Sequence, residues 1–210
     1  MTITSTLLSL LVVLGGALGA SAQTNRTTGI PCSTNSGADC VCAPGLDYSE
    51  SVTWAVVGAP VEDVAIVMND FQKPAWRGSL PYATDGPNNL PGRSQRTSTY
   101  RTLKGTFNLT EILTKRQVKH DGSFIQKLEY LGAVGNTTGN PWGGYWITIS
   151  GDYIFGDETL IEWSTYLCSR GVVNDWAKSH EASFKNVIDL LKNKTTGNTV
   201  APFSVPKAFS

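Results

Sequence analysis

The segment FNLTEIL, residues 107–113, places a carboxylate close to a glycan acceptor on one apolar stretch. Its alternation of apolar and polar residues predicts a β-strand, in which successive side chains point to opposite faces. Asn108 begins an Asn-X-Thr sequon, and a glycosylated Asn108 must face solvent. Glu111 is then expected inside the protein, together with Phe107 and Leu109. A lone buried carboxylate has a raised pKa and can donate or accept a proton at neutral pH.

Arg96, Tyr130 and His180 are the other side chains expected to take part in such chemistry. An inward-facing Arg96 within reach of Glu111 would satisfy both charges, either as a structural ion pair or as part of a reactive site. Tyr130 belongs to a strand-like run that follows Glu111 in the chain. His180 lies on the apolar stripe of the expected helix. Two roles are open for it: a proton-transfer group, or a hydrogen-bonded core histidine. The candidate catalytic residues are therefore Glu111, His180, Arg96 and Tyr130.

Aromatic and aliphatic side chains share faces with these polar groups. On two further strand-like runs, Tyr145 alternates in phase with Ile147, and Trp163 alternates in phase with Ile161. Trp and Tyr combine apolar area with one polar atom, which suits a pocket for a ring system bearing a few oxygens, although core packing also explains them. The candidate ligand-binding residues are Tyr100, Phe107, Leu109, Tyr145, Trp163, Trp176 and Phe184.

Hydrophobic periodicity predicts the elements that carry these residues. Strand-like runs cover residues 51–57, 93–103, 106–117, 123–131, 145–155 and 158–168, with turn-forming residues between them. Residues 60–71 indicate a short helix that begins at a proline. Residues 172–192 carry apolar side chains at helical spacing and predict a long amphipathic helix. This order predicts an α+β fold in which an antiparallel sheet has one buried face, closed by the long C-terminal helix.

The four cysteines, Cys32, Cys40, Cys42 and Cys168, are expected to form disulfides. Cys40 and Cys42 are too close in sequence to bridge each other. Two pairings remain open: Cys32–Cys40 with Cys42–Cys168, or Cys32–Cys42 with Cys40–Cys168. In either case one bridge joins the N-terminal segment to a distant strand. The two histidines show no ligand spacing relative to the cysteines, so we expect no metal.

The N-terminal residues predict export from the cytosol. Residues 1–22 have an apolar run followed by Ala-Ser-Ala, the pattern of a cleaved signal peptide. Acceptor sequons follow at Asn25, Asn108, Asn136 and Asn193. We therefore expect a glycoprotein that is secreted or held in the lumen of the secretory pathway, with no integral membrane segment in the mature chain.

The composition narrows the classes of partner. The chain has 17 basic and 17 acidic residues, which argues against a large basic surface for nucleic acid. No nucleotide-binding or metalloprotease motif is present, and we expect no cofactor. The expected division is a Cys-containing extension over residues 23–50, one domain over 51–193 and a tail over 194–210. The sequence does not predict the oligomeric state.

Four segments resemble a known superfamily in the right order and spacing. They are GAPVEDVAIVMNDFQKPAW, GRSQRTSTY, TEIL followed by SFIQKLEYL, and LIEWSTYL, within residues 51–192. They resemble the helix-grip fold of the START, birch-pollen-allergen and polyketide-cyclase superfamily. The Cys-containing segment, the signal peptide and the glycine-rich stretch 136–144 depart from its usual pattern. Ala65 stands where the family often has Trp.

The resemblance implies a curved antiparallel sheet wrapped around the long C-terminal helix, with an internal apolar cavity. It also implies that Arg96 and Trp163 face inward. Members of the superfamily bind lipids, sterols or hormones, and some cyclise, aromatise or dehydrate polyketide-like substrates. We favour an enzyme that promotes cyclisation, dehydration or isomerisation of a polyketide- or terpenoid-like molecule. The alternatives are a non-catalytic carrier of a lipid, sterol or similar metabolite and, less favoured, an extracellular interaction protein.

Overall fold

The structure is a computed structural model that describes residues 30–33, 40–102, 105–134, 142–170 and 176–208. The expected signal peptide and the sequons at Asn25 and Asn136 lie outside these residues. Asn108 lies on the outer face of its strand, where its Oδ1 accepts a hydrogen bond from the Thr99 hydroxyl at 2.8 Å. Asn193 is exposed. Both positions are compatible with glycosylation, which stays a prediction.

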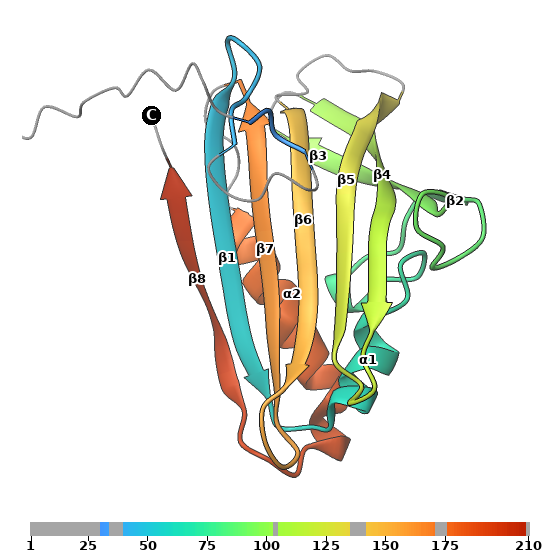
Figure 1. Ribbon diagram of the computed structural model, residues 1–210, viewed down its shortest axis with the longest axis vertical. Helices are drawn as coiled ribbons and strands as arrows, with labels where there is room; N and C mark the ends of the chain where they lie inside the picture. The colour runs from blue at the N-terminus through green and yellow to red at the C-terminus, as the bar shows by residue number, and fades with distance from the viewer. Residues whose placement is uncertain (1–29, 34–39, 103–104, 135–141, 171–175, 209–210) are drawn as a thin grey trace, which may run out of the picture.

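Within the described residues the strands form one eight-stranded sheet (Figure 1). The strands are β1 (Asp47–Val57), β2 (Ala83–Asp85), β3 (Gln95–Thr102), β4 (Gly105–Val118), β5 (Phe124–Val134), β6 (Trp142–Tyr153), β7 (Thr159–Ser169) and β8 (Val200–Ala208). Their order is β2-β3-β4-β5-β6-β7-β1-β8, and every neighbouring pair is antiparallel. The sheet is bent, so that β3 runs across the direction of β1 in this view.

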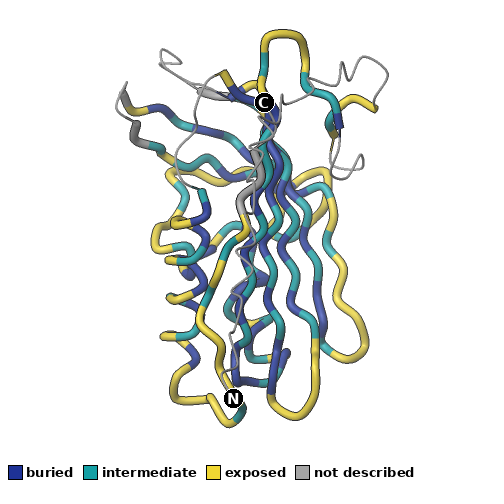
Figure 2. The backbone as a smooth tube through the Cα atoms, turned by 90° about the vertical axis from the view of Figure 1, so that its left-hand side faces the viewer, coloured by how far each residue is buried: buried dark blue, intermediate teal, exposed yellow. Residues whose placement is uncertain are grey.

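The helices gather on one face of this sheet. They are α1 (Val61–Met68), the short 3₁₀ helix η1 (Ala75–Arg77), α2 (Trp176–Leu191) and the short η2 (Lys192–Lys194). Helix α2 packs against β1, β8 and η1, and α1 packs against α2 and β6. Seen from the side, the residues between α2 and the sheet are buried, whereas the far side of α2 is exposed (Figure 2). The expected α+β helix-grip architecture is therefore confirmed, and its internal cavity stays a prediction.

Each expected strand and helix is present, and those ends that fall within the described residues differ from the expected ones by a few residues. The structure adds two strands, β2 and β8. Strand β2 has only three residues. Strand β8 lies in the segment expected to be a tail, and it pairs with β1 as an edge strand. Its two prolines argue against a central strand, but an edge strand tolerates proline because one row of its N–H groups needs no partner. The sheet therefore extends past residue 193.

Side-chain alternation on β4 and β7 builds the core beneath α2. On β4, Phe107, Leu109 and Glu111 are buried, with Asn108 on the opposite face, as expected. On β7, Ile161 and Trp163 are buried in the same way. Together with Phe184 of α2 they belong to one continuous hydrophobic core. Glu111 is therefore a carboxylate set inside an apolar interior.

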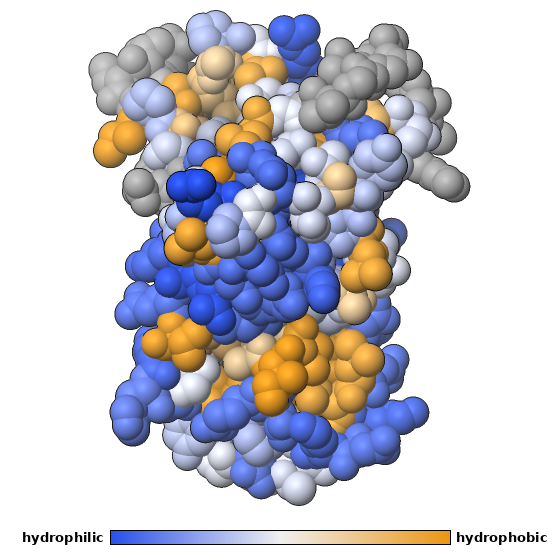
Figure 3. Space-filling view, turned by 90° about the vertical axis from the view of Figure 1, so that its right-hand side faces the viewer, coloured by the Kyte–Doolittle hydropathy of each residue, from blue (hydrophilic) through white to orange (hydrophobic). Residues whose placement is uncertain are grey.

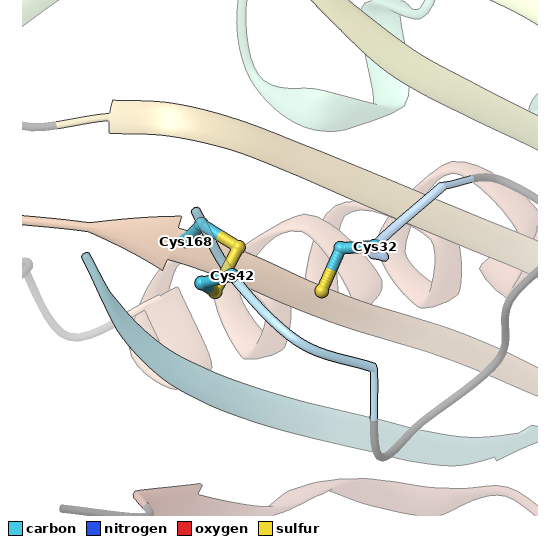
Figure 4. Close-up of side chains that lie close together, drawn as sticks. All are labelled: Cys32, Cys42 and Cys168. Carbon is cyan, nitrogen blue, oxygen red and sulfur yellow. A yellow bond between two sulfur atoms is a disulfide. The ribbon is translucent and has the colours of Figure 1, made fainter. Parts of the chain in front are cut away.

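Two disulfides hold the N-terminal segment against the end of the sheet. Cys32 pairs with Cys40, and Cys42 pairs with Cys168 at the end of β7, which selects one of the two open pairings. Figure 4 shows the Cys42–Cys168 bridge beside Cys32, whose sulfur lies within 4.8 Å of the other two. Because all of these sulfurs are in disulfides, none is a thiolate available to a metal ion.

The outer surface on the β2 and β4 side is largely polar, with apolar patches nearer α1 (Figure 3). The outward side chains of β3 and β4 include Thr97 and Thr110, whose hydroxyls hydrogen-bond at 3.0 Å. Ile66 of α1 is an exposed apolar residue. Among the described helices, none is long and apolar enough to cross a bilayer.

Candidate functional site

Glu111 is the centre of a buried polar network. Its Oε2 accepts hydrogen bonds from Arg96 Nε at 2.6 Å and from Arg77 Nη1 at 3.3 Å. Its Oε1 accepts a hydrogen bond from the Tyr145 hydroxyl at 3.0 Å. The Glu111 side chain is 1% exposed, and that of Arg96 is 2% exposed. The carboxylate thus has two cationic partners and one phenolic partner, of which Arg96 and Tyr145 are buried and Arg77 is half-buried.

Sheet register and a short helix bring these groups together. Arg96 on β3 lies directly opposite Glu111 on β4, so the pair meets across two adjacent strands. Tyr145 comes from the inner face of β6. Arg77 is the last residue of η1, which ends at Gly78 in a left-handed conformation with φ 84°. Four separate segments therefore supply the network.

Arg96 is held rigidly. Besides its bond to Glu111, its Nη1 donates to the Phe71 carbonyl at 2.8 Å. Its guanidinium carbon lies 4.5 Å from the centre of the Phe71 ring, a cation–π distance. Arg77 is held more loosely, because its bonds are longer and its side chain is 13% exposed. The two arginines thus differ in how firmly they are fixed to Glu111.

The charges around Glu111 decide its ionisation. Burial by itself raises the pKa of this carboxyl. The charges of Arg96 and Arg77 and the hydrogen bonds together outweigh burial and lower the pKa to about 2. Glu111 is therefore ionised at neutral pH. The raised pKa expected for a lone buried carboxylate does not apply, because the carboxylate is not alone. Glu111 and Arg96 do form an internal ion pair, and a part for this pair in a reaction stays a prediction.

Two tyrosines border the arginines. Tyr100 accepts a hydrogen bond from Arg77 Nη2 at 3.5 Å. Burial and the charge of Glu111 raise the pKa of the Tyr100 and Tyr145 hydroxyls. Both hydroxyls therefore keep their protons at neutral pH. Tyr130, an expected catalytic residue, stacks on the Tyr145 ring with centroids 5.3 Å apart, so it touches the network through that ring.

His180 occupies a different position from the Glu111 network. It lies on α2, is 1% exposed, and stacks on the Trp163 ring with centroids 4.0 Å apart. Neither ring nitrogen has a hydrogen-bond partner among the described residues. Burial, with a smaller contribution from the charge of Arg77, lowers the pKa of His180 to about 3. His180 is therefore a neutral imidazole at neutral pH, with one donor and one acceptor nitrogen.

Arg77 links His180 and Trp163 to the carboxylate. Its guanidinium carbon lies 4.9 Å from the centre of the Trp163 ring. Arg77 was not among the site residues expected from the sequence. The short stretch PAWRG contains no periodic pattern, and only the side-by-side Trp and Arg after a proline marked it. A helix of three residues gives no face from which the direction of an arginine can be predicted.

Aromatic rings surround the polar network on both sides. One group joins Tyr100, Phe107, Trp142, Tyr145 and Trp176, with centroid distances from 5.1 to 6.4 Å. The second group joins Trp76, Trp163 and Phe184. All seven expected ligand-binding residues lie in this interior: five are buried, and Tyr100 and Trp176 are partly buried and pack against them. Trp142 and Trp76 were not among the expected residues.

Several buried polar atoms in this interior have no hydrogen-bond partner among the described residues. They are the indole nitrogens of Trp76, Trp163 and Trp176, Arg96 Nη2, Thr165 Oγ1 and both ring nitrogens of His180. Buried polar groups in native proteins are nearly always satisfied by protein, water or ligand. Their concentration beneath α2 therefore marks this interior as the candidate ligand site.

The fold and this interior define a helix-grip protein with a polar network inside an aromatic shell. Residues 48–208 match the START domain family, and the chain belongs to that family. The resemblance seen in the sequence is thereby confirmed, and with it a fold that supports hydrophobic ligand binding. No curated protein matches the chain.

Solved structures with the same fold are distant in sequence. Norcoclaurine synthase from Thalictrum flavum, in complex with dopamine and hydroxybenzaldehyde, is similar with a TM-score of 0.52 and 13% identity. That match covers 71% of this chain and 89% of the synthase. The protein XoxI from Bacillus cereus is similar with a TM-score of 0.50 and 16% identity, over 69% of this chain and 96% of XoxI. These likenesses show the fold.

Proposed function

We propose that this protein binds an oxygen-bearing hydrophobic molecule between α2 and the inner face of the sheet and promotes its cyclisation, dehydration or isomerisation. Polyketide- or terpenoid-like compounds are the proposed substrates. The observation that carries the proposal is the burial of the Arg77–Glu111–Tyr145 network within aromatic rings. A buried ion pair is a weak source of stability because desolvation offsets the Coulombic gain, so a functional role explains its presence better.

Positioning is the first contribution to catalysis. The rings of Tyr100, Trp142 and Trp176 present flat apolar surfaces that hold a flexible substrate in one conformation. Norcoclaurine synthase, which shares the fold, holds two aromatic molecules in its structure. We propose an analogous use of the interior here.

Polarisation and proton transfer are the second contribution. Arg77 and the Tyr100 hydroxyl polarise a substrate carbonyl, whose oxygen becomes more negative in the transition state. The acceptor nitrogen of His180 takes the proton from the carbon next to that carbonyl. In a dehydration the same proton goes to the departing hydroxyl, so water leaves, a C=C bond forms and His180 returns to its neutral state. Glu111 orients Arg77 and Tyr145 throughout.

One observation favours the alternative, a carrier that does not convert its ligand. The pKa of Glu111 is about 2 and that of His180 is about 3, so both are weak bases at neutral pH. A pocket whose ionisable groups keep fixed protonation states suits binding without chemistry. Carrier and enzyme share the same interior and differ in the fate of the ligand.

The proposed place of action is the cell exterior or the lumen of the secretory pathway. The two disulfides support this, because such bridges persist in oxidising compartments. The exposed Asn193 and the outward Asn108 are available as glycan acceptors there. The expected signal peptide at residues 1–22 would direct the export.

The protein purified from its own host provides the test. Native mass spectrometry is expected to show one bound small molecule, which is then extracted and incubated with fresh protein. Conversion is expected with the natural sequence and with the exposed-residue controls His120→Ala and Glu62→Gln. His180→Ala and Glu111→Gln are expected to keep binding and lose at least tenfold in rate. His180 is the proposed general base, a role that contributes about 100-fold or more, and Glu111 positions Arg77 and Tyr145.

Two outcomes of this experiment test the enzyme hypothesis against the carrier hypothesis and test the residue roles. If the natural protein returns the extracted molecule unchanged under all conditions, the carrier is correct. If conversion occurs and both His180→Ala and Glu111→Gln convert at the natural rate, the roles assigned to these two residues are wrong.

A further inference from the structure

The described interior holds an unbalanced charge. Arg77 and Arg96 are guanidiniums and remain protonated at neutral pH, whereas Glu111 is the carboxylate that both contact. The tyrosines of the network keep their protons, and His180 is neutral. Within the network around Glu111, two positive charges therefore face one negative charge. An uncompensated buried charge is costly, so the site favours a further negative group.

Arg77 is the more loosely held of the two arginines and has donors to spare, while Arg96 keeps one nitrogen, Nη2, without a partner among the described residues. Arg77 makes one bond to Glu111 at 3.3 Å and one to Tyr100 at 3.5 Å, whereas a guanidinium offers five N–H donors. Arg96, in contrast, is fixed by short bonds to Glu111 and to the Phe71 carbonyl. A ligand can therefore recruit Arg77 without breaking the Arg96–Glu111 pair.

The unpartnered polar atoms around Arg77 are mainly donors. Trp163, whose ring faces the Arg77 guanidinium, has a buried indole N–H with no partner among the described residues. His180, stacked on Trp163, adds one N–H, and Trp76, which packs edge-on against Trp163, adds another. A cluster of donors beside a cation is complementary to a group that offers only acceptors.

We propose that the ligand is a monoanion whose ionised oxygen group, a carboxylate or an equally acidic enolate, pairs with Arg77 while its apolar part lies among the aromatic rings. This proposal rests on the proposed function and specifies its ligand class: an apolar organic acid rather than a sterol, alcohol or other neutral lipid. In a carrier Arg77 anchors the acid. In an enzyme Arg77 anchors the ionised oxygen group, and the neighbouring Tyr100 hydroxyl is the donor left for a reacting carbonyl.

Matched probes that share the apolar part and differ in the charge of the polar end group test the ligand class. Decanoate is compared with 1-decanol, and 2-naphthoate with 2-naphthamide, by displacement of the neutral fluorophore N-phenyl-1-naphthylamine at pH 7. The two pairs separate an aliphatic from an aromatic apolar part. Each acid is expected to bind about 10- to 100-fold more tightly than its neutral partner, the range of a charge-assisted hydrogen bond.

Variants assign that preference to Arg77. Arg77→Gln is expected to abolish the preference for the acid while neutral probes bind within about threefold of the natural protein. Arg77→Lys keeps the charge and is expected to retain part of the preference. Arg93→Gln removes an exposed positive charge and is the matched control, with the preference unchanged.

The outcomes are distinguishable. If neutral probes bind the natural protein as tightly as the acids, the anionic ligand class is wrong and the binding function stands. If Arg77→Gln keeps the full preference for the acids, the pairing of the anion with Arg77 is wrong. If neither the fluorophore nor any probe binds, the binding function fails and this inference fails with it.

A second measurement uses the natural protein and tests the proposal even if Arg77→Gln does not fold. Carboxyl-¹³C decanoate bound to the natural protein is expected to stay ionised at pH values where the free acid is protonated. Titration of the bound carboxyl at the pH of the free acid, or above it, would overturn the proposal.

Discussion

Arg96 and Glu111 lie directly opposite each other on β3 and β4, and 2.6 Å separates the Arg96 Nε from the Glu111 Oε2. This pair is inside the core, where both side chains are at most 2% exposed. The pair fixes a negative charge beneath α2, and that charge in turn orients Arg77 and Tyr145. The charge of the site and the orientation of its hydrogen-bond donors follow from this arrangement.

Breaking the buried pair is expected to destabilise the protein strongly. Arg96→Met leaves Glu111 with its longer bond to Arg77 and its bond to Tyr145, and we expect a loss of about 3 kcal/mol in the free energy of unfolding. The matched control is Lys119→Met, which removes the exposed pair of Lys119 with Asp152 and is expected to cost less than about 1 kcal/mol. Urea unfolding measures both. Equal effects of the two substitutions would contradict a central role for the buried pair.

Stability is expected to fall in mild acid because of His180. Its pKa is about 3 in the folded protein and is ordinarily 6.5, so the unfolded chain binds the proton first as the pH falls. The contribution of His180 to the free energy of unfolding is fully present above pH 6.5. It declines by up to about 1.4 kcal/mol per pH unit as the pH falls towards 3. Glu111 adds a second loss of unfolding free energy as the pH falls from 4.5 to about 2, because its pKa is lower in the folded protein than in the unfolded chain.

Substitution separates these two groups. His180→Phe keeps an aromatic ring against Trp163 and removes the titrating nitrogens, so its unfolding free energy is expected to change much less between pH 6.5 and 4.5. The exposed His120→Gln is the control and is expected to follow the natural protein. Chemical denaturation at each pH gives the comparison. A His180→Phe protein with the natural pH dependence would show that His180 is not buried as a neutral group.

The two disulfides are expected to differ in their effect on stability. Cys42–Cys168 spans 126 residues, whereas Cys32–Cys40 spans eight. By loop-closure entropy, removing the first costs about 4 to 5 kcal/mol and removing the second costs about 2 to 3 kcal/mol. Paired Cys→Ala substitutions under non-reducing conditions test the order. Peptide mapping that recovered Cys32 joined to Cys42 would contradict the pairing itself.

Strand β8 is expected to be part of the folding unit. Truncation after residue 199 removes the strand that pairs with β1, including the Ser204 hydroxyl that hydrogen-bonds Thr53 at 2.8 Å and the Phe203 ring that packs on Trp54. We expect the melting temperature to drop by several degrees or the chain to become insoluble. Removal of residues 209–210 alone is the control. A truncated chain with the natural melting temperature would show that β8 is dispensable.

Alternation and helical periodicity predicted the sheet, the long helix and the inward side of Glu111, because one buried face imposes a period of two on a strand. The inward position of Arg96, opposite Glu111, agrees with what the resemblance to the superfamily implied. Arg77 was missed because its direction depends on a three-residue helix. Strand β8 was missed because prolines at an edge leave no strand-like pattern. Trp142 was missed because it follows a glycine-rich stretch whose pattern resembles a loop.

Ionisation could not be predicted from the sequence alone. The pKa of Glu111 depends on how many cations reach it, and the second cation, Arg77, is 34 residues away in the chain. The low pKa of His180 likewise depends on complete burial against Trp163 and on the nearby charge. Both are properties of packing between distant segments.

The central claim, that a small molecule binds among the rings beneath α2, is tested most directly by indole ¹⁵N–¹H NMR during titration with 2-naphthoate. The indole N–H signals of Trp163 and Trp176 are expected to shift, because these groups are buried and unpartnered among the described residues. The signal of Trp54 is expected to stay unchanged, because its Nε1 already donates to Glu162 at 2.9 Å. Saturable shifts confined to Trp163, Trp176 and their neighbours would support the claim. Unchanged interior signals, or a shift at Trp54 alone, would contradict it.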